Sequence, residues 1–141
     1  MIFIRSIINK YNILNNLYIK DIKANTLPHI AHLHTKTWID SYTDIFKRSF
    51  LNYSTLYPNR LDDWSNRIKN SNNITRIIYL HDIPIGFFHI VPHNNHVFIS
   101  DFHVISEFKR NYVGVYMFNE IFNLYKFTHI NTFMLCVYEA L

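Results

Sequence analysis

The sequence predicts a single α/β (α+β) domain, in which helices flank a mainly antiparallel sheet. Its 141 residues are enough for one hydrophobic core. Apolar residues make up 49% of the chain and charged residues only 17%, a balance typical of a folded globule. Helical spacing of apolar residues dominates the first half, and strand-like runs dominate the second. The predicted element order is therefore β-α-α-β-β-β-α-β.

The first half opens with a strand candidate over residues 17–23. A helix follows that begins at Asn25 or Thr26, either of which can act as N-cap, and ends near Tyr42. Pro28 lies in the first turn of this helix, where its missing N–H costs little. The N-terminal part of the domain is therefore predicted as one strand and one long helix.

A second helix is predicted over residues 58–69, because Leu61, Trp64 and Ile68 repeat at helical spacing. The polar run at 70–73 ends this helix. Three strands that form an antiparallel meander, a helix and a final strand are then predicted, over residues 76–80, 83–91, 97–104, 113–125 and 133–137.

The N-terminal segment has some apolar character, but it does not predict a membrane anchor. Arg5, Asn9 and Lys10 interrupt the apolar run well short of the roughly 20 residues that span a bilayer. We expect an N-terminal extension over residues 1–16, one domain over residues 17–141, and no membrane partner.

Charge and cysteine content say little about partners. The formal charge is +4, but the basic residues are scattered from Arg5 to Lys126 and never exceed two in a row. This pattern favours anionic partners and gives only weak support for nucleic acid. The single cysteine, Cys136, offers no disulfide framework. We expect a cytoplasmic protein.

The segment 102–122 passes from a strand through a basic turn into an apolar helix. A helix N-terminus presents unpaired N–H groups and about half a positive charge, so it can bind an anion such as a phosphate. Lys109 and Arg110 add full charges, and Gly114, one of only two glycines in the chain, leaves the backbone accessible. The alternative is an ordinary connection whose two basic side chains are solvated.

This segment resembles the motif of the GNAT superfamily of acyl-CoA-dependent N-acyltransferases. Tyr112 stands where the motif has its first glycine, Ser106 replaces a proline, and Lys109 replaces an arginine or glutamine. Other parts of the chain resemble the family in the same order, namely "ANTLPHIAHLHTKTWIDSY", Gly86 in "HDIPIGFFHI", and "MLCV". The motif positions are occupied by Val104, Ser106, Phe108, Lys109, Tyr112, Val113 and Gly114.

The resemblance implies an N-acetyltransferase that moves an acetyl group from acetyl-CoA directly to a primary amine in a ternary complex. It implies that backbone N–H groups cradle the coenzyme pyrophosphate, and that the backbone of Phe102 and Val104 pairs with the pantetheine arm. The acceptor would be a small-molecule or peptide amine. The cradle is carried over to Lys109, Arg110, Asn111, Tyr112, Val113, Gly114 and Val115.

Three residues are candidates for the chemistry. Many family members place a glutamate base where this chain has Phe98, so that base is absent. Asp101 and His103 lie on the same strand and, by alternation, on the face opposite Phe98, Phe102 and Val104. Either can titrate usefully or be structural. Tyr42 lines an acceptor pocket or packs against Trp38.

No metal site is predicted. His29, His32 and His34 are close in sequence, but only positions 29 and 32 share a helix face, and no cysteine or carboxylate completes a tetrahedral set. No P-loop or Ser-His-Asp order is present either.

The C-terminal end departs from the family pattern. Leu141 stands where many members have an asparagine. In those members a helix follows, whose tyrosine protonates the leaving thiolate, and then two more strands. The resemblance therefore implies a truncated domain, and we expect self-association through an exposed sheet edge. Two other functions remain open: a catalytically decayed module that binds coenzyme A or a partner, and a basic nucleic-acid-binding domain.

Overall fold

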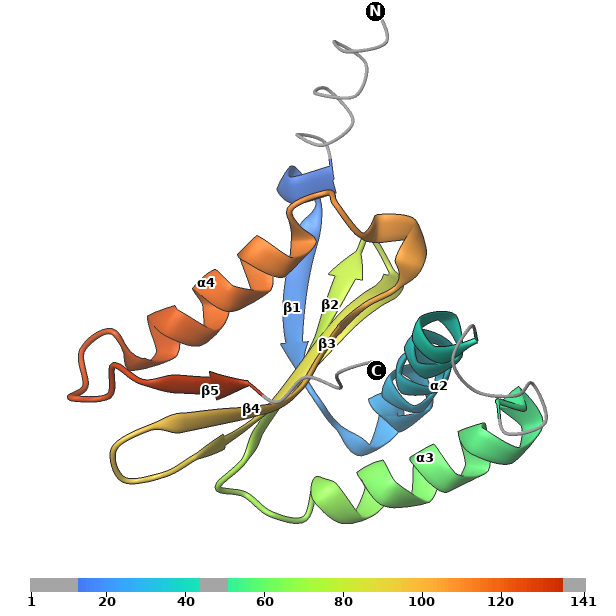
Figure 1. Cartoon of the computed structure of the whole chain (residues 1–141), viewed down its shortest axis with the longest axis horizontal. Helices are drawn as coiled ribbons and strands as arrows, with labels where there is room; N and C mark the ends of the chain where they lie inside the picture. Colours follow the sequence, from blue (N-terminus) through green and yellow to red (C-terminus); the bar gives the residue numbers. More distant parts are fainter. Residues whose placement is uncertain (1–12, 44–50, 136–141) are drawn as a thin grey trace, which may run out of the picture.

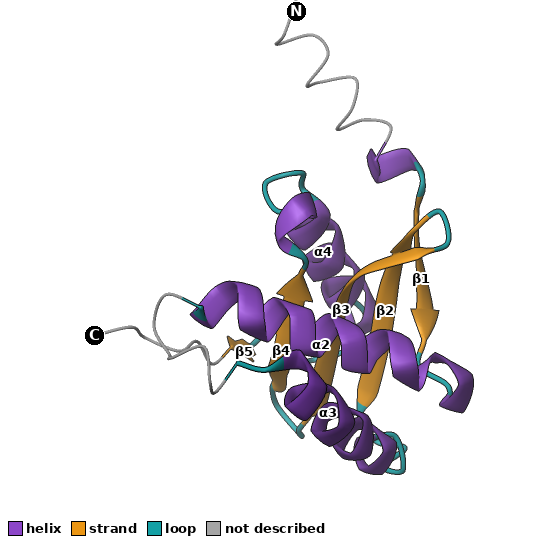
Figure 2. Ribbon diagram, turned by 90° about the vertical axis from the view of Figure 1, so that its right-hand side faces the viewer, coloured by secondary structure: helices purple, strands orange, loops and turns teal. Residues whose placement is uncertain are grey.

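The computed structural model describes residues 13–43 and 51–135, in which five strands form one sheet with helices on both faces. Helix α4 lies on one face, and helices α2 and α3 lie on the other (Figure 1). The turned view shows α2 crossing the strands with α3 beside it (Figure 2). The predicted fold class and element order are confirmed. The elements are β1 (Leu17–Asp21), η1 (Ala24–Thr26), α2 (Leu27–Tyr42), α3 (Tyr53–Arg67), β2 (Ile74–Leu80), β3 (Ile83–Pro92), β4 (Val97–Val104), η3 (Ser106–Phe108), α4 (Val113–Tyr125) and β5 (Phe133–Leu135).

The sheet order is β1-β2-β3-β4-β5, and the first four strands pair antiparallel. The predicted meander is therefore confirmed. Strand β5 joins the edge of β4 in parallel, through the pairs Val97↔Phe133, Phe98↔Met134 and Ile99↔Leu135. The last two residues of the predicted final strand, 136 and 137, lie outside the described residues, as do residues 1–12 of the predicted extension.

Several predicted boundaries were wrong, including the end of α3, at Arg67 rather than residue 69, and the start of β2, at Ile74 rather than residue 76. Strand β1 ends at Asp21 rather than at residue 23. Helix α3 begins at Tyr53, five residues before the predicted start, because the Asn52 side chain caps it by accepting the Ser54 N–H at 3.0 Å. Pro58 therefore lies inside α3 rather than in its first turn. A strong N-cap thus outweighs the usual preference of proline for the first turn.

Helix α2 follows the prediction closely, with Pro28 at its start and Tyr42 at its end. Thr26 occupies the N-cap position, but its hydroxyl accepts the Lys23 N–H at 2.9 Å instead of a helix N–H. Ile30 and Leu33 on the buried side of α2 are both fully buried against the sheet. The helix therefore docks through the apolar stripe that its sequence spacing predicts.

A β-bulge in β4 changes which residues share a face. His89 pairs with Asp101 and Ile90 pairs with Ile99, so Ser100 is an extra residue in β4. The Ser100 hydroxyl donates to the Asp101 carboxylate at 2.9 Å, as expected when the two bulged residues point to the same side. The extra residue resets the alternation of β4 at its midpoint.

The bulge corrects the face assigned to Phe98. Phe98 pairs with Val91, which lies two residues from His89, so Phe98 is on the same face as Asp101 and not opposite it. His103 is on this face too, since its ring lies 5.0 Å from that of Phe87, which packs on α3 through Trp64.

Phe102 is on the other face, where its ring stacks on Phe118 of α4 at 4.1 Å. Phe102 and Val104 therefore point away from Asp101 and His103, as predicted, because β4 has no second bulge between residues 101 and 104.

The core fills the space between the sheet and its helices. Trp64 of α3 packs edge-on against Phe87 of β3, with ring centroids 5.6 Å apart. The largest fully buried side chains are Trp64, Phe87, Phe88, Ile30, Leu33, Ile77, Ile78, Ile85, Ile90, Ile99, Met117 and Ile121.

Gly86 marks the closest approach between β3, β4 and α4. A Cβ atom at this position would lie 2.9 Å from the His103 carbonyl oxygen and 3.3 Å from the Met117 sulfur. This carbonyl belongs to the backbone of β4, so it cannot move without moving His103.

We predict that Gly86→Ala lowers the free energy of unfolding by about 1–3 kcal/mol, the usual cost of overpacking a core. The control is Gly114→Ala, whose added Cβ would meet only Phe102 Cε1 at 3.8 Å and should not destabilise the helix. Urea denaturation followed by circular dichroism measures both. Equal stability of the Gly86 variant and the wild type would contradict the packing described here.

Candidate functional site

A groove opens where the chain leaves β4, forms η3 and enters α4. It has a volume of about 240 Å³ and is lined by Phe102, Val104, Phe108, Lys109, Arg110 and Gly114. A second hollow of about 340 Å³ shares Arg110 and Gly114 with it and adds Tyr112 and Val115. The structure thus brings together most of the residues predicted to bind the coenzyme.

Two of the predicted coenzyme residues line neither the groove nor the second hollow. Val113 is buried in the core with 1% of its surface exposed, so only its backbone can take part in binding. The Asn111 side chain donates to the Lys109 carbonyl at 3.2 Å and so shapes the turn itself.

The backbone of the turn explains why glycine suits it. Arg110 and Tyr112 have φ values of 65° and 63°, in the left-handed region that favours glycine. Tyr112 is 55% exposed, and it lines the hollow next to the groove. Gly114 has no positive φ. Glycine at position 114 therefore keeps the groove open and is not needed for the backbone conformation.

The second half of β4 presents an open edge beside the groove. The Ile105 N–H donates to the Ile85 carbonyl at 2.9 Å, so the backbone groups of Phe102 and Val104 point to the opposite edge, because ladder hydrogen bonds alternate. Within the described residues, the pairing of β5 with β4 stops at Ile99 (Figure 1). Phe102 and Val104 can therefore pair with an extended ligand.

Side chains of α2 hold the turn in place. The Ser106 hydroxyl donates to the Asp40 carboxylate at 2.6 Å. The Lys36 ammonium lies 3.1 Å from Asp40 and 3.0 Å from Glu107. The hydrogen bond to Glu107 is the main cause that raises the pKa of Lys36. This network fixes η3, and hence the N-terminus of α4, relative to the helix layer on the other face.

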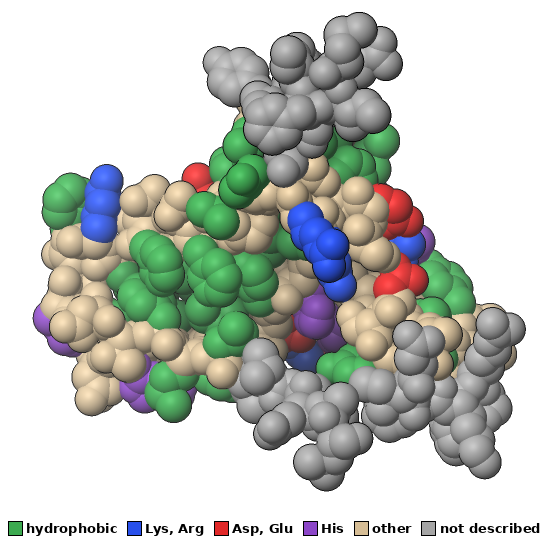
Figure 3. Space-filling view, turned by 45° about the horizontal axis from the view of Figure 1, so that its top comes forward, with side chains coloured by type: hydrophobic (Ala, Val, Ile, Leu, Met, Phe, Trp, Pro, Cys, Tyr) green, Lys and Arg blue, Asp and Glu red, His purple; other side chains and the backbone are tan. Residues whose placement is uncertain are grey.

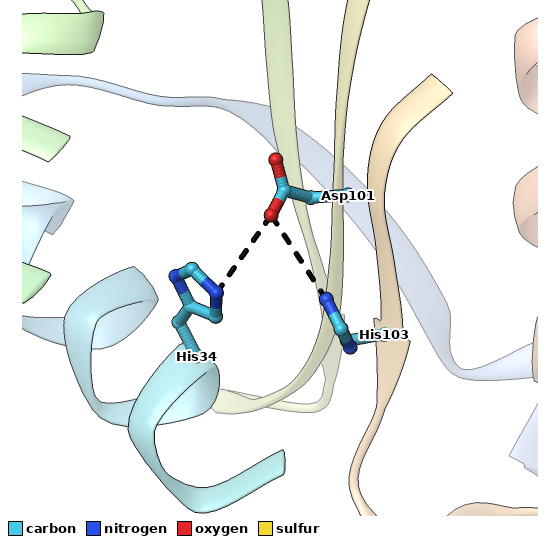
Figure 4. A group of neighbouring side chains, drawn as sticks. All are labelled: His34, Asp101 and His103. Atoms are coloured by element: carbon cyan, nitrogen blue, oxygen red, sulfur yellow. Dashed lines mark ion pairs between the residues drawn. The ribbon is translucent and has the colours of Figure 1, made fainter. Parts of the chain in front are cut away.

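On the face covered by α2 and α3, three titratable side chains converge: His34 of α2 with Asp101 and His103 of β4 (Figure 4). His34 Nε2 lies 3.7 Å and His103 Nε2 lies 4.0 Å from the same oxygen, Asp101 Oδ1. Both distances are too long for a direct hydrogen bond, but a small shift or one water molecule could bridge them.

Asp101 is buried and ionised. Burial alone would raise the pKa of Asp101, but the charge of Arg67 and the hydrogen bonds from Arg67 and Ser100 outweigh burial and lower it. Arg67 Nη1 lies 2.7 Å from Asp101 Oδ2. Because Arg67 and Ser100 occupy Oδ2, the other oxygen faces the two imidazoles.

His34 is neutral, with its proton in a defined position. Burial lowers the pKa of His34 to about 3, and the charge of Arg60 adds to this effect. The Trp64 indole N–H, which can only donate, points to His34 Nδ1 at 3.0 Å. The proton of the neutral ring is therefore on Nε2, the atom that faces Asp101.

This proton assignment bears on metal binding. The ligand atoms of His34, Asp101 and His103 lie within 4.8 Å of one another, which is close enough for a metal cluster. A protonated Nε2 cannot ligate a cation, however, and Arg67 already neutralises the carboxylate. The group therefore fits the handling of a proton better than the binding of a metal.

His103 is the member of the cluster that a ligand can reach, since 29% of its side chain is exposed, against 5% for His34. Figure 3 shows a histidine in a hollow of the surface, beside Lys and Arg side chains and next to a hydrophobic patch. Burial lowers the pKa of His103, and the positive charges of Arg60 and Lys109 lower it further. The negative charge of Asp101 raises it, but not enough to cancel these effects. The ring is therefore neutral at pH 7 and can accept a proton.

Aromatic side chains lie at the end of α2, one and two helical turns beyond His34. The Tyr42 ring lies 4.3 Å from the Trp38 ring, one turn earlier on α2. The Arg60 guanidinium of α3 lies 5.2 Å from the centroid of the Trp38 ring. Tyr42 therefore has the packing role that the sequence allowed, and its position leaves the predicted role in an acceptor pocket open.

The other two histidines of α2 do not join the cluster. His29 Nδ1 bonds to the Tyr79 hydroxyl at 2.9 Å, and His32 Nδ1 bonds to the Tyr53 hydroxyl at 2.7 Å. Sequence reasoning missed His34 because it separated this residue from His29 and His32 only to exclude a metal site, and did not ask what the other helix face contacts. The available signal was spacing, since His34 lies four residues after Ile30, on the buried stripe of α2.

A larger cavity of about 370 Å³ lies elsewhere, between β1, β2 and the C-terminal end of α3. Two arginines line it, but both are already paired: Arg67 with Asp63 and Asp101, and Arg76 with Asp21. Its charges are therefore used within the fold, and we do not assign it to the site.

Comparisons with solved structures identify the fold. The PaiA N-acetyltransferase of Thermoplasma acidophilum, solved with coenzyme A, is similar with a TM-score of 0.65 and 14% identity, over 78% of this chain and 72% of that one. A predicted acetyltransferase of Clostridium acetobutylicum, solved with acetyl-CoA, has a TM-score of 0.65 and 11% identity, over 87% of this chain and 82% of that one. An aminoglycoside acetyltransferase from an uncultured soil metagenomic sample, in complex with sisomicin, has a TM-score of 0.62 and 14% identity, over 90% of this chain and 81% of that one.

No protein-family model and no curated protein sequence matches this chain. The structural likeness establishes the GNAT fold, as the sequence resemblance predicted. Within the described residues, no helix combines the length and the apolar character needed to cross a membrane.

The buried histidine predicts a pH dependence of stability. The pKa of His34 is about 3 in the folded chain and about 6.5 when unfolded, so below pH 6.5 the unfolded state binds more protons. Stability therefore falls as pH falls from about 6.5 towards 3, by up to about 1.4 kcal/mol per pH unit for this one group.

His34→Gln keeps an acceptor for Trp64 and should flatten this dependence, whereas His32→Gln, at an exposed position of the same helix, should not. Urea denaturation between pH 7 and pH 5 measures the slopes. Parallel slopes for wild type and His34→Gln would show that His34 is not held neutral by the fold.

Proposed function

We propose that this protein is an N-acetyltransferase that transfers the acetyl group of acetyl-CoA to the amine of a small molecule or peptide. The observation that carries the proposal is the groove at the N-terminus of α4, which continues onto the open edge of β4. A neutral imidazole, His103, belongs to the same strand. The acetyltransferases of the same fold that were solved with coenzyme A or acetyl-CoA support it.

The coenzyme would bind along this groove. Backbone N–H groups from Arg110 to Val115 would hold the pyrophosphate, since they lie at the positive end of the helix dipole, whereas the Lys109 N–H already donates to the Ser106 carbonyl at 3.3 Å. Lys109 and Arg110, both of which line the groove, would add charge. The backbone of Phe102 and Val104 would pair with the amide groups of the pantetheine arm, which would direct the thioester towards the middle of β4.

His103 would act as the general base. An amine attacks the thioester only when it is neutral, so its proton must be removed. Asp101 faces His103 Nε2 and favours a proton on that atom, which leaves Nδ1 to accept the proton of the amine. Asp101 would therefore be a positioning residue, and His34 would hold it from the other side.

The amine would enter from the side of α2 and α3. Tyr42 and Trp38 would form an aromatic wall of the acceptor pocket. Because His103 is partly exposed on this face and the backbone edge of β4 carries the thioester, attack would occur across the strand. The bulge at Ser100 lies in the same stretch and turns both Asp101 and His103 towards the acceptor.

Tyr112→Gly tests the coenzyme site. We predict that it tightens acetyl-CoA binding severalfold, because glycine adopts the left-handed backbone without strain and removes a ring from the hollow beside the groove. Isothermal calorimetry with acetyl-CoA gives the Kd.

His81→Gly is the matched control, since His81 also has a positive φ, of 54°, but does not line the groove. Unchanged or weaker affinity of the Tyr112 variant would contradict the placement of the pyrophosphate. The absence of any acetyl-CoA binding by the wild type would overturn the proposed function.

His103→Gln tests the chemistry. We predict a loss of about 10²–10⁴-fold in kcat, the usual contribution of a general base, with little change in the KM for acetyl-CoA. Thiol release with a panel of amines measures it. His96→Gln, in the β3–β4 hairpin, is the control.

The pH profile separates a base from a structural histidine. In the wild type, kcat/KM should fall on the acid side of the lowered pKa of His103, below pH 6.5. Asp101→Asn removes the group that raises this pKa, so the acid limb should move to lower pH, while Arg60 and Lys109 still act on the ring. An acid limb that stays in place would remove His103 from the mechanism.

A further inference from the structure

Arg60 of α3 differs from Arg67 and Lys36, because the described residues give it no ion-pair partner. Arg67 pairs with Asp63 at 3.0 Å and with Asp101 at 2.7 Å. Lys36 pairs with Asp40 and Glu107. No carboxylate of a described residue lies within ion-pair distance of Arg60. None of these residues would therefore compete with an anionic ligand for its charge.

Arg60 is partly buried and one of its donors is unsatisfied. Its Nε has almost no contact with solvent and, among the described residues, no hydrogen-bond partner. A buried donor left without a partner destabilises the fold. Burial also lowers the pKa of Arg60, because the guanidinium is partly removed from water. A bound anion at the terminal Nη groups would offset this desolvation of the charge.

The position of Arg60 connects it to the proposed acceptor pocket. Its guanidinium lies over the Trp38 ring, 5.2 Å from the centroid, and Trp38 stacks with Tyr42. Arg60 also acts electrostatically on both His34 and His103. Trp38 lies one helical turn after His34 on α2, and Arg60 lies one turn before Trp64, the hydrogen-bond partner of His34, on α3. The cation thus lies one turn along both helices from the buried end of the cluster.

The pairing of the charges around Arg60 favours one class of acceptor. Asp101, which carries the negative charge of the cluster, is buried and paired with Arg67, which also pairs with Asp63. Asp40 and Glu107 share one cationic partner, Lys36. A polycationic acceptor would therefore meet Arg60 without a free carboxylate to balance it, whereas an acceptor with its own carboxylate would pair with the planar guanidinium.

We propose that Arg60 binds the carboxylate of the acceptor, and that the acceptor is an amino acid or a similar small molecule that carries both an amine and a carboxylate. This inference rests on the proposed acetyl transfer. The carboxylate would lie at Arg60, beside the Trp38 ring, and the amine would point to His103. The chemistry differs from that of sisomicin, which the soil metagenome enzyme of the same fold binds.

The test compares each amino acid with its amide in thiol-release assays with acetyl-CoA. The amide lacks the negative charge, and its amine is less basic, so a larger neutral fraction favours its reaction. A preference for the acid must therefore come from recognition of the carboxylate. For the wild type, we expect kcat/KM to be at least tenfold higher for the acid than for its amide. For Arg60→Gln, we expect the two values to be about equal, because the KM for the acid rises.

Two further variants sharpen the result. Arg60→Lys keeps the charge without the planar fork and should retain part of the preference. Arg76→Gln removes an arginine that pairs with Asp21 on the outer strands and should leave the preference unchanged. The KM for acetyl-CoA should be the same in every variant. If Arg60→Gln is too unstable to assay, calorimetry of the wild type with coenzyme A present should show binding of the acid and not of the amide.

The outcomes separate the two proposals. Thiol release that is equal or faster with amides or polyamines would overturn the role of Arg60 and leave the acetyltransferase standing. A preference for acids that survives in Arg60→Gln would also overturn it. Acetyl-CoA binding without thiol release from any amine would instead contradict the proposed transfer itself.

Discussion

The ion pair between Asp101 and Arg67, 2.7 Å apart, is the interaction on which the face covered by α2 and α3 depends. It joins β4 to the last residue of α3, and so fixes the helix layer against the sheet. Removing one partner of a fully buried pair typically costs about 3–5 kcal/mol, and the cost is smaller here because 29% of the Arg67 side chain is exposed. The same contact occupies one carboxylate oxygen and turns the other towards His34 and His103. Structural and chemical roles therefore meet in a single side chain.

Strand β4 serves two sides of the proposed reaction. Phe102 and Val104 face α4 and the coenzyme groove, whereas Asp101 and His103 face α2 and α3. Since adjacent residues of a strand point to opposite faces, a stretch of four residues can contact both reactants. The network of Lys36 and Asp40 with Ser106 adds a second link between the faces.

The fold and the groove at the N-terminus of α4 could be predicted because their signals are local. A strand, a basic turn, Gly114 and an apolar helix follow one another in sequence, and the groove forms from that same segment. The cluster on the other face could not be predicted, because it is assembled from α2, α3 and β4. Neither His34 nor Arg60 has a neighbour in sequence that reveals its partners, and the burial of Asp101 depends on Arg67, 34 residues away.

Loss of the extra residue at Ser100 would not change which side chains of β4 share a face, because the pairs on either side of it, His89 with Asp101 and Ile90 with Ile99, already alternate as in an ordinary ladder. A homologue without this residue would keep Ile99 in the core and Asp101 on the opposite face. It would lose the hydrogen bond from the Ser100 hydroxyl to Asp101, and with it the local bend and added twist of a bulge. Among homologues, the presence of this residue should therefore vary with the direction in which β4 bends, and not with the set of side chains that faces the core.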